Sequence, residues 1–430
     1  MNEFDQIRPY NDEEVRPAIE SLLRDRQFSR LLKGMLPIVP LGMSRGMLRL
    51  ATLGVKTTLQ FQLRFMKPVV NYILRRCTTG HTFDYHTLCP DGKTPPKEER
   101  YLFLSNHRDI VLDSALLDVM LIDEGFPTTC EIAIGDNLLI YPWIRTLVRL
   151  NKAFIVRRNI SRKELYESSL LMSRYIRHAI TEKHENVWMA QREGRAKDSS
   201  DHTQESLLKM LAMSGGKRYE VGGKRNELDT LKSSQETNVS SYLSPLASYL
   251  QNIKSLHIVP LAISYEYDPC DYLKAKEFQQ KRDDAAWKKS KQDDLVNMKT
   301  GIMGRKGHVH YQTGRPVSEW IDELQEAMQQ PGADGQMPTE KDFYTMLARR
   351  IDREIHRSYR LFPGNYVAAD LLSGEPTHAA HYTHKEKLAF EQYIRERIAL
   401  IDLPNRDDDF LRERLLTMYA NPVLNKEKAE

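Results

Sequence analysis

The stretch from residue 101 to residue 125 reads YLFLSNHRDIVLDSALLDVMLIDEG. Its first seven residues form an apolar run that ends in polar residues, which predicts a buried strand followed by a loop. Residues 110–125 repeat apolar side chains with helical period and end at Gly125, which predicts a helix. A strand that leads through a short loop into a helix is typical of a parallel α/β sheet.

The same alternation continues along the chain. Further strands are expected at 130–136, 153–159, 186–194, 256–268 and 307–317, and helices at 141–151 and 161–185. The nearly all-apolar 256–268 strand should be central, whereas the alternating 307–317 strand should be an outer one. Ser161 followed by Glu164 is a capping-box pattern. We therefore expect an α/β fold with a mostly parallel sheet flanked by helices.

Other stretches depart from this alternation. Residues 195–240 are polar and predict a loop or flap, and residues 271–306 predict a polar helical excursion on the surface. From residue 318 the composition is helical, and the last six residues are expected to fray. We predict three parts: a basic amphipathic segment at 1–83, an α/β domain at 84–317 and a C-terminal helical region at 318–430.

The positive charge is concentrated near the N-terminus. Ten of the 63 basic residues and no acidic residue lie between residues 26 and 83, which leaves 53 basic against 59 acidic residues elsewhere. Each apolar run in this segment is shorter than the roughly 18 residues that span a bilayer. The pattern favours an amphipathic segment on an anionic membrane surface, and the alternative is a pair of helices packed on the core. No nucleic-acid partner is expected, because aromatic side chains do not alternate with the cations.

Length and composition exclude several classes of protein. The chain has 430 residues, of which 40% are hydrophobic and 28% charged, which excludes polytopic membrane, collagen-like and wholly disordered proteins. The four cysteines form no CxxC pair, so we expect neither a disulfide framework nor a zinc ribbon, and a reducing compartment. The acidic, polar N-terminus does not read as a secretory signal.

The first chemical motif follows the strand predicted at 101–107. His107 stands close to Asp109 and Asp113. A carboxylate that fixes the tautomer of a histidine makes a general-base dyad, and the alternative is a surface histidine beside a helix-capping aspartate. The HRD tripeptide is also found in protein kinases, but Ser114 stands where a kinase needs asparagine, and no glycine-rich loop or DFG motif is present.

Three further polar groups follow or enter predicted strands. They are Arg157 and Arg158; Glu193, Gly194, Arg195 and Lys197; and Pro260. The paired arginines could clamp a phosphate or carboxylate, or simply end a solvated strand. The glycine of the second group lets the backbone approach a ligand, and its two cations could bind an anion. The proline enters the buried strand at 256–268.

These four groups, in this order over residues ~100–317, resemble the four sequence blocks of the glycerolipid acyltransferase superfamily, which includes glycerol-3-phosphate and lysophosphatidate acyltransferases. The resemblance implies that His107 takes the proton from an acceptor hydroxyl as it attacks an acyl thioester. The acid of the family lies five residues after the histidine, where this chain has Leu112, and Asp113 is one residue further on. We expect Asp113 to orient His107 and Asp109 to cap the helix, with the reverse assignment left open.

The resemblance also implies roles for the other blocks. The paired arginines would bind the acceptor phosphate, the EG-R block would bind an anion, and the proline would shape the acyl or acceptor pocket. The matching residues are Arg157 and Arg158, then Glu193, Gly194 and Arg195, then Pro260. The EG-R block is one residue shorter than in the family, so Lys197 could share the role of its arginine. Backbone N–H groups at the start of the 110–125 helix would meet the oxyanion.

The resemblance implies a membrane-associated O-acyltransferase of phospholipid biosynthesis. It would transfer a fatty acyl group from acyl-CoA or acyl-carrier protein to a hydroxyl of lysophosphatidate or glycerol-3-phosphate, without a metal or prosthetic group. The basic N-terminal segment is similar to the membrane-docking helices of bacterial lysophosphatidate acyltransferases, which implies a peripheral or monotopic protein on the cytoplasmic face of a membrane that contains anionic lipid.

Two other classes of function stay open at this point. One is a thioester or phosphoester hydrolase that uses the same histidine and aspartate, alone or with a metal held by His107, Asp109 and Asp113. The other is a non-catalytic membrane-binding or interaction module that keeps the fold.

Overall fold

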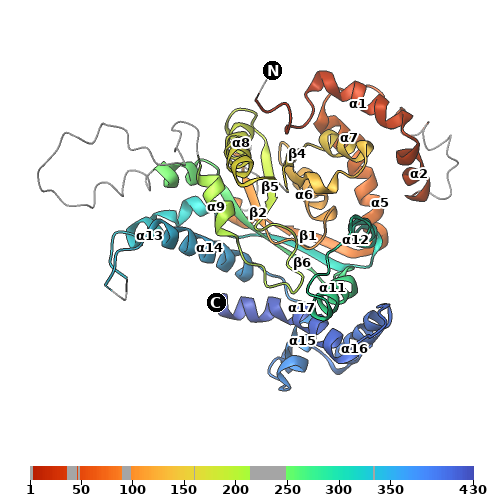
Figure 1. The fold of residues 1–430 in the computed structure, drawn as a ribbon, viewed down its shortest axis with the longest axis vertical. Helices are drawn as coiled ribbons and strands as arrows, with labels where there is room; N and C mark the ends of the chain where they lie inside the picture. The colour runs from red at the N-terminus through yellow and green to blue at the C-terminus, as the bar shows by residue number, and fades with distance from the viewer. Residues whose placement is uncertain are drawn as a thin grey trace, which may run out of the picture.

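A seven-stranded sheet runs through the middle of the molecule (Figure 1). The computed structural model describes residues 3–35, 46, 49–89, 98–158, 160–213, 248–332 and 335–430. The strands are β1 (Thr78–Asp84), β2 (Leu102–Ser105), β3 (Cys130–Gly135), β4 (Ala153–Val156), β5 (Asn186–Ala190), β6 (Ile258–Tyr265) and β7 (Gly307–Thr313). Their order is β1-β7-β6-β2-β5-β3-β4, and only β6 and β7 pair antiparallel. The predicted mostly parallel α/β sheet is confirmed.

Strand β6 lies inside the sheet, as its sequence predicted, whereas β7 does not lie at the edge, where we expected it. Every residue of β2 and β6 is buried, as their apolar runs predicted. Strand β7 is second from the edge because β1 pairs beyond it. Strand β1 was not predicted: its sequence, TTGHTFD, is largely polar and only partly buried, as an edge strand can be.

Helices cover both faces of the sheet (Figure 1). Those of the α/β part are α6 (Leu112–Asp123), α7 (Pro142–Leu150), α8 (Arg162–Thr181) and α9 (Glu205–Ala212). Leu102 and Leu104 of β2 belong to the core cluster that contains Tyr175 of α8. Phe103, between them, belongs to the cluster that contains Leu117 of α6. This alternation places one core on each face of the sheet.

Two local predictions in this part have clear outcomes. The capping box of α8 forms: Ser161 Oγ accepts from the Glu164 N–H at 3.3 Å, and Glu164 Oε2 accepts from the Ser161 N–H at 2.8 Å. The loop predicted at 195–240 instead contains helix α9 in its described part, and residues 214–240 lie outside the described residues.

The N-terminal segment contributes several short helices to the domain. They are α1 (Asp12–Arg24), α2 (Arg26–Met35), α4 (Thr58–Phe61), a π-helical turn (Gln62–Met66) and α5 (Lys67–Cys77). Phe28, Phe61 and Phe65 are buried in one cluster with Leu150 of α7, so this segment does pack on the core. None of the described helices combines the length and apolar character that crossing a bilayer requires.

The prediction of a helical excursion on the surface at 271–306 is wrong. Helices α11 (Asp271–Asp283) and α12 (Lys291–Met303) both pack against the domain, and Ile302 of α12 packs against Ile73 of α5. Helix α11 hides polar side chains: Lys274 is buried and its Nζ lies 2.5 Å from Asp268 Oδ2. A helix that buries paired charges has no apolar stripe by which its sequence would reveal the burial.

The C-terminal helical region packs under the sheet (Figure 1). Its helices are α13 (Ile321–Ala327), α14 (Glu340–Arg357), α15 (Pro363–Ser373), α16 (His384–Ala399) and α17 (Asp408–Ala429). Helix α14 buries Leu347 and Ile351 in the same cluster as strand β2. The expected fraying of the last residues is wrong, because α17 continues to Ala429, whose carbonyl accepts from Arg353 Nε at 2.9 Å.

His378 joins α15 to α17 and makes the stability depend on pH. Its Nδ1 lies 2.6 Å from Asp370 Oδ1, and its Nε2 lies 2.8 Å from Glu427 Oε1. Burial lowers the pKa of His378, but the hydrogen bonds with Glu427 and Asp370 outweigh burial and raise the pKa above its usual value. A raised histidine pKa stabilises the fold below the unfolded-state pKa, and this stabilisation disappears as the pH rises through the folded-state pKa.

We therefore expect His378→Gln to lower the free energy of unfolding at about pH 6 by roughly 1 kcal/mol, and to change it little at about pH 9. Denaturant unfolding of both proteins at the two pH values measures this. An equal loss at both values would show that the charge of His378 does not stabilise the contact.

Candidate active site

The central histidine stands at the carboxyl end of β2, where parallel α/β sheets place their ligands. Asn106 fixes this strand end to β6: its Nδ2 donates to the Ile263 carbonyl at 2.9 Å, and its Oδ1 accepts from the Ile263 N–H at 2.7 Å. The next residue, His107, places Nδ1 2.8 Å from Asp113 Oδ2. The imidazole is 14% exposed, so it is held by the protein and still reachable from outside.

Asp113 is fully buried at the start of α6 and is surrounded by hydrogen-bond donors. Its Oδ2 also accepts from the backbone N–H groups of Arg108 and Asp109, at 2.6 and 3.0 Å. Its Oδ1 accepts from the hydroxyl of Tyr265, at the end of β6, at 2.9 Å. Because Asp113 is surrounded by donors, His107 Nδ1–H donates to it in this arrangement, which leaves Nε2 as the acceptor nitrogen.

Asp109 has a different task. Its Oδ1 accepts from the N–H groups of Val111 and Leu112 at 2.9 and 2.8 Å, and so caps α6. Burial, together with the neighbouring Asp113, raises the pKa of the Asp109 carboxyl. The structure thus brings Asp113, and not Asp109, against His107. Helix α6 starts at Leu112 and so places Asp113 in its first turn.

Four backbone N–H groups near the start of α6 already have acceptors in the protein. The N–H groups of Arg108 and Asp109 donate to Asp113, and those of Val111 and Leu112 donate to Asp109. These four groups at the start of α6 are therefore not free to meet a developing oxyanion, and that expectation is wrong for them.

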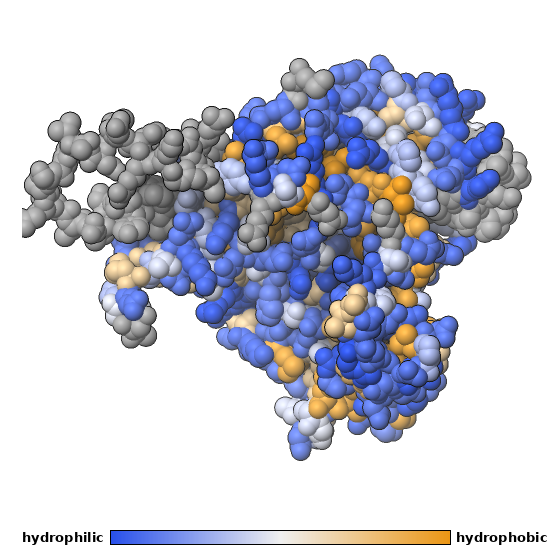
Figure 2. Space-filling model, in the orientation of Figure 1, coloured by the Kyte–Doolittle hydropathy of each residue, from blue (hydrophilic) through white to orange (hydrophobic). Residues whose placement is uncertain are grey.

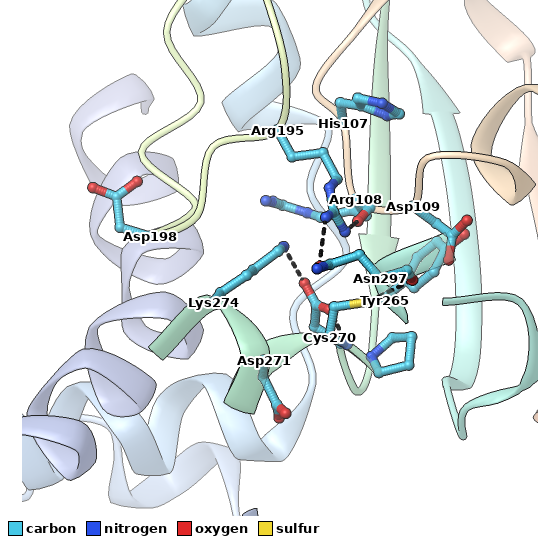
Figure 3. Close-up of polar contacts among 12 residues, drawn as sticks. His107, Arg108, Asp109, Arg195, Asp198, Tyr265, Cys270, Asp271, Lys274 and Asn297 are labelled. Carbon is cyan, nitrogen blue, oxygen red and sulfur yellow. Dashed lines mark hydrogen bonds and ion pairs between the residues drawn. The ribbon is translucent and has the colours of Figure 1, made fainter. Parts of the chain in front are cut away.

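Arg195, in the loop after β5, lies near His107 and Arg108 (Figure 3). Its Nη2 donates to Asn297 Oδ1 of α12 at 3.0 Å, and its Nη1 donates to the Arg108 carbonyl at 3.4 Å. Among the described residues, no carboxylate oxygen lies within 4.0 Å of its guanidinium nitrogens. Burial lowers the pKa of Arg195, but the nearby Cys270, Asp268 and Asp109 outweigh burial and raise it.

Helix α12 brings two residues to the site that the sequence analysis missed. One is Asn297, the partner of Arg195. The other is Gly301, where an added Cβ would lie 2.3 Å from Asp109 Oδ2, so only glycine allows the helix to come this close. The signal available in the sequence was a single glycine inside a helical pattern, which often marks close packing.

Trp188 of β5 was also missed. Its ring meets the His107 ring edge-on, with centroids 5.5 Å apart, and its Nε1 donates to Ser105 Oγ at 3.1 Å. It therefore supports the imidazole from the side of β5.

The two arginines after β4 separate. Arg157 is exposed, and its Nη2 donates to Gln6 Oε1 of the N-terminal segment at 2.5 Å. Arg158 forms an ion pair with Glu193 and passes over Gly135, where a Cβ would lie 2.6 Å from its Nε. Strand β4 is three strands away from β2, about 14 Å at the usual strand spacing. A role for these arginines toward a ligand at His107 stays a prediction.

The remaining predicted residues take structural positions. Lys197 forms an ion pair with Glu277 of α11. Gly194 has φ +68°, a left-handed turn that favours glycine. Pro260 lies inside β6, buried beside Leu104 of β2, and its carbonyl accepts from the Gly314 N–H at 2.8 Å. Of the predicted binding residues, Arg195 is thus the one whose contacts lie directly at the His107 motif.

Across the part of the chain that the structure describes, no three or more His, Cys, Asp or Glu side chains form a group that could hold a metal ion.

Comparison with known proteins bears on the chemistry of this site. The family model described as Acyltransferase matches residues 90–218. No curated protein matches the chain. The matched stretch contains the His107–Asp113 pair and Arg195. Residues 90–218 are therefore an acyltransferase domain of the glycerolipid acyltransferase family, and the protein is an acyltransferase enzyme.

Proposed function

We propose that the protein transfers a fatty acyl group from acyl-CoA or acyl-carrier protein to a hydroxyl of lysophosphatidate or glycerol-3-phosphate, in phospholipid biosynthesis. The observation that carries this proposal is the guanidinium of Arg195, which has no ion-pair partner among the described residues and donates to the carbonyl of Arg108, next to His107. A base with a cation beside it suits an acceptor that has a hydroxyl and a phosphate close together.

The proposed reaction starts with neutral His107. Its Nδ1–H donates to Asp113, and its Nε2 takes the proton from the acceptor hydroxyl as the oxygen attacks the thioester carbonyl. The C–O bond forms, the tetrahedral intermediate collapses, and the C–S bond breaks. The leaving thiolate takes the proton from Nε2, which restores neutral His107. The Asp113 carboxylate stabilises the imidazolium that exists between these two steps.

The test is a transfer assay with labelled acyl-CoA and acyl-carrier protein, offered glycerol-3-phosphate, lysophosphatidate, and the same acceptors without the phosphate. We expect transfer to a phosphate-bearing acceptor, and we expect Arg195→Ala to raise the KM for that acceptor about 10- to 100-fold, as the loss of a charged hydrogen bond would. The phosphate-free acceptors should not respond to this substitution. Release of free fatty acid without transfer to any acceptor would instead assign a hydrolase.

We further propose that the enzyme works as a peripheral protein on the cytoplasmic face of a membrane with anionic lipid. The support is the N-terminal patch, which we define as Arg49, Leu50, Leu53, Lys56, Leu63 and Arg64. Its leucines are unusually exposed, with Leu50 at 73% and Leu53 at 64%. Exposed leucines among cations, with no acidic residue from 26 to 83, fit the boundary of an anionic bilayer. Figure 2 also shows apolar residues gathered over the α5–α7 side of one face, bordered by hydrophilic ones.

Liposome binding tests the role of the N-terminal patch. We expect Leu50→Glu combined with Leu53→Glu to weaken binding to anionic liposomes at least tenfold, because two apolar contacts are lost and two negative charges face the lipid. Leu388 and Leu400 of the C-terminal region are 50% and 56% exposed and provide the matched control. Equal binding by both double variants would refute the membrane role of the patch.

A further inference from the structure

The loop that carries Arg195 is closed and strained. Its ends meet where the Gln204 N–H donates to the Gln191 carbonyl at 2.9 Å. Ser199 and Asp201 have φ values of +57° and +48°, in the left-handed region that residues other than glycine rarely adopt. Such a backbone persists only when its surroundings hold it in place. The contacts of this loop, residues 191–204, therefore show what holds it.

One holder is Asp201, which is buried and binds three residues outside the loop. Its carboxylate accepts from Arg108 Nη1 and Nη2 at 3.2 and 2.6 Å, and from the Tyr359 hydroxyl at 2.6 Å. Its carbonyl lies 3.0 Å from His356 Nε2 of α14. Asp201 thus attaches the loop both to the residue beside His107 and to the C-terminal helical region.

A second holder is α17, besides the bonds of Arg195 to Asn297, Lys197 to Glu277 and Thr203 to Asp352 of α14. Asn421 Nδ2 donates to the Asp198 carbonyl at 2.6 Å, and Asn425 Nδ2 donates to the carbonyls of Ser199 and Ser200 at 3.3 and 3.2 Å. Two amides on successive turns of one helix thus bind three consecutive carbonyls, at the place where the loop backbone is left-handed.

Arg108 connects these contacts to the chemistry. Its N–H donates to Asp113 Oδ2, its carbonyl accepts from Arg195 Nη1, and its guanidinium binds Asp201. A shift of the loop would therefore move Arg195 relative to His107. Figure 3 shows Arg108, Arg195 and His107 gathered at this point, with Asp198 on the far part of the loop.

We infer that the C-terminal helical region holds the loop of residues 191–204, and thereby sets where the anionic group of the acceptor binds relative to His107. Asp201, Asn421 and Asn425 are positioning residues in this arrangement. The inference rests on the proposed function to the extent that Arg195 binds the acceptor phosphate.

The test uses the full-length enzyme with Asn421→Ala and Asn425→Ala combined. Thr417→Ala is the matched control, because its hydroxyl lies on the same helix and donates only to the Glu413 carbonyl of that helix. We expect amide hydrogen exchange of residues 192–203 to become about tenfold faster in the double variant, with exchange of the sheet unchanged. We expect the KM for the phosphate-bearing acceptor to rise about tenfold, with kcat at saturating acceptor and the KM for the acyl donor within about twofold of wild type.

Each arm can overturn the inference. Unchanged exchange in residues 192–203 would show that α17 does not hold the loop. Faster exchange with an unchanged acceptor KM, or an equal rise in both KM values, would show that the loop does not place the acceptor. A wild-type enzyme that transfers to no phosphate-bearing acceptor would instead overturn the proposed function, and the exchange arm would still decide whether α17 holds the loop.

Discussion

His107→Ala is expected to lower kcat for acyl transfer by about 10²–10⁴-fold, the range that a positioned general base contributes. Without the imidazole, no described group takes the place of Nε2 between the acceptor hydroxyl and the thioester. The folded protein should persist, because the side chain is partly exposed and, among the residues that the structure describes, hydrogen-bonds only to Asp113. Steady-state kinetics and denaturant unfolding of both proteins measure the two effects separately.

The matched control for this variant is His86→Ala. His86 also lies beside an aspartate, with Nδ1 2.6 Å from Asp84 Oδ1, but both side chains are exposed at the edge of the sheet. Activity should stay within about twofold of wild type in this variant. If His107→Ala keeps more than a tenth of the activity, His107 is not the base, and the non-catalytic reading of its motif gains support.

Asp113→Asn is expected to lower kcat by about 10²–10⁴-fold, because an amide presents N–H₂ where the carboxylate accepts hydrogen bonds and cannot stabilise an imidazolium. Asp109→Asn should lower it no more than a few-fold. The amide oxygen can still accept from Val111 and Leu112, and burial with the neighbouring Asp113 already raises the pKa of Asp109 toward the neutral form. The pair of variants therefore separates the orienting carboxylate from the capping one.

Rates and unfolding free energies of the two variants should be measured together, since Asp113 also ties Tyr265 to α6. A loss of activity that follows the loss of folded protein would describe a structural defect alone. A large loss in Asp109→Asn with a small loss in Asp113→Asn would move the orienting role to Asp109.

Much of the fold could be predicted because its central strands are buried on both sides. Strands β2 and β6 read as uninterrupted apolar runs, α6 ends just before Gly125, and α8 begins at its capping box. Strand β1 escaped prediction because a short polar edge strand is stabilised by its neighbour β7 and not by its own side chains.

The sequence alone determined the α/β class and the four ordered blocks, and it predicted His107 as the base, because strand burial, helix capping and motif order are local properties. It left open which aspartate faces His107, because the path of the backbone in the turn between them decides which carboxylate reaches the imidazole. It also did not indicate Asn297, Gly301, Asn421 and Asn425, which lie 100 to 230 residues from the loops they contact. Tertiary structure decided these contacts. A polar side chain can bind a partner from anywhere in the chain, and two helices can pack closely at any pair of positions, so neither kind of contact leaves a periodic pattern in the sequence.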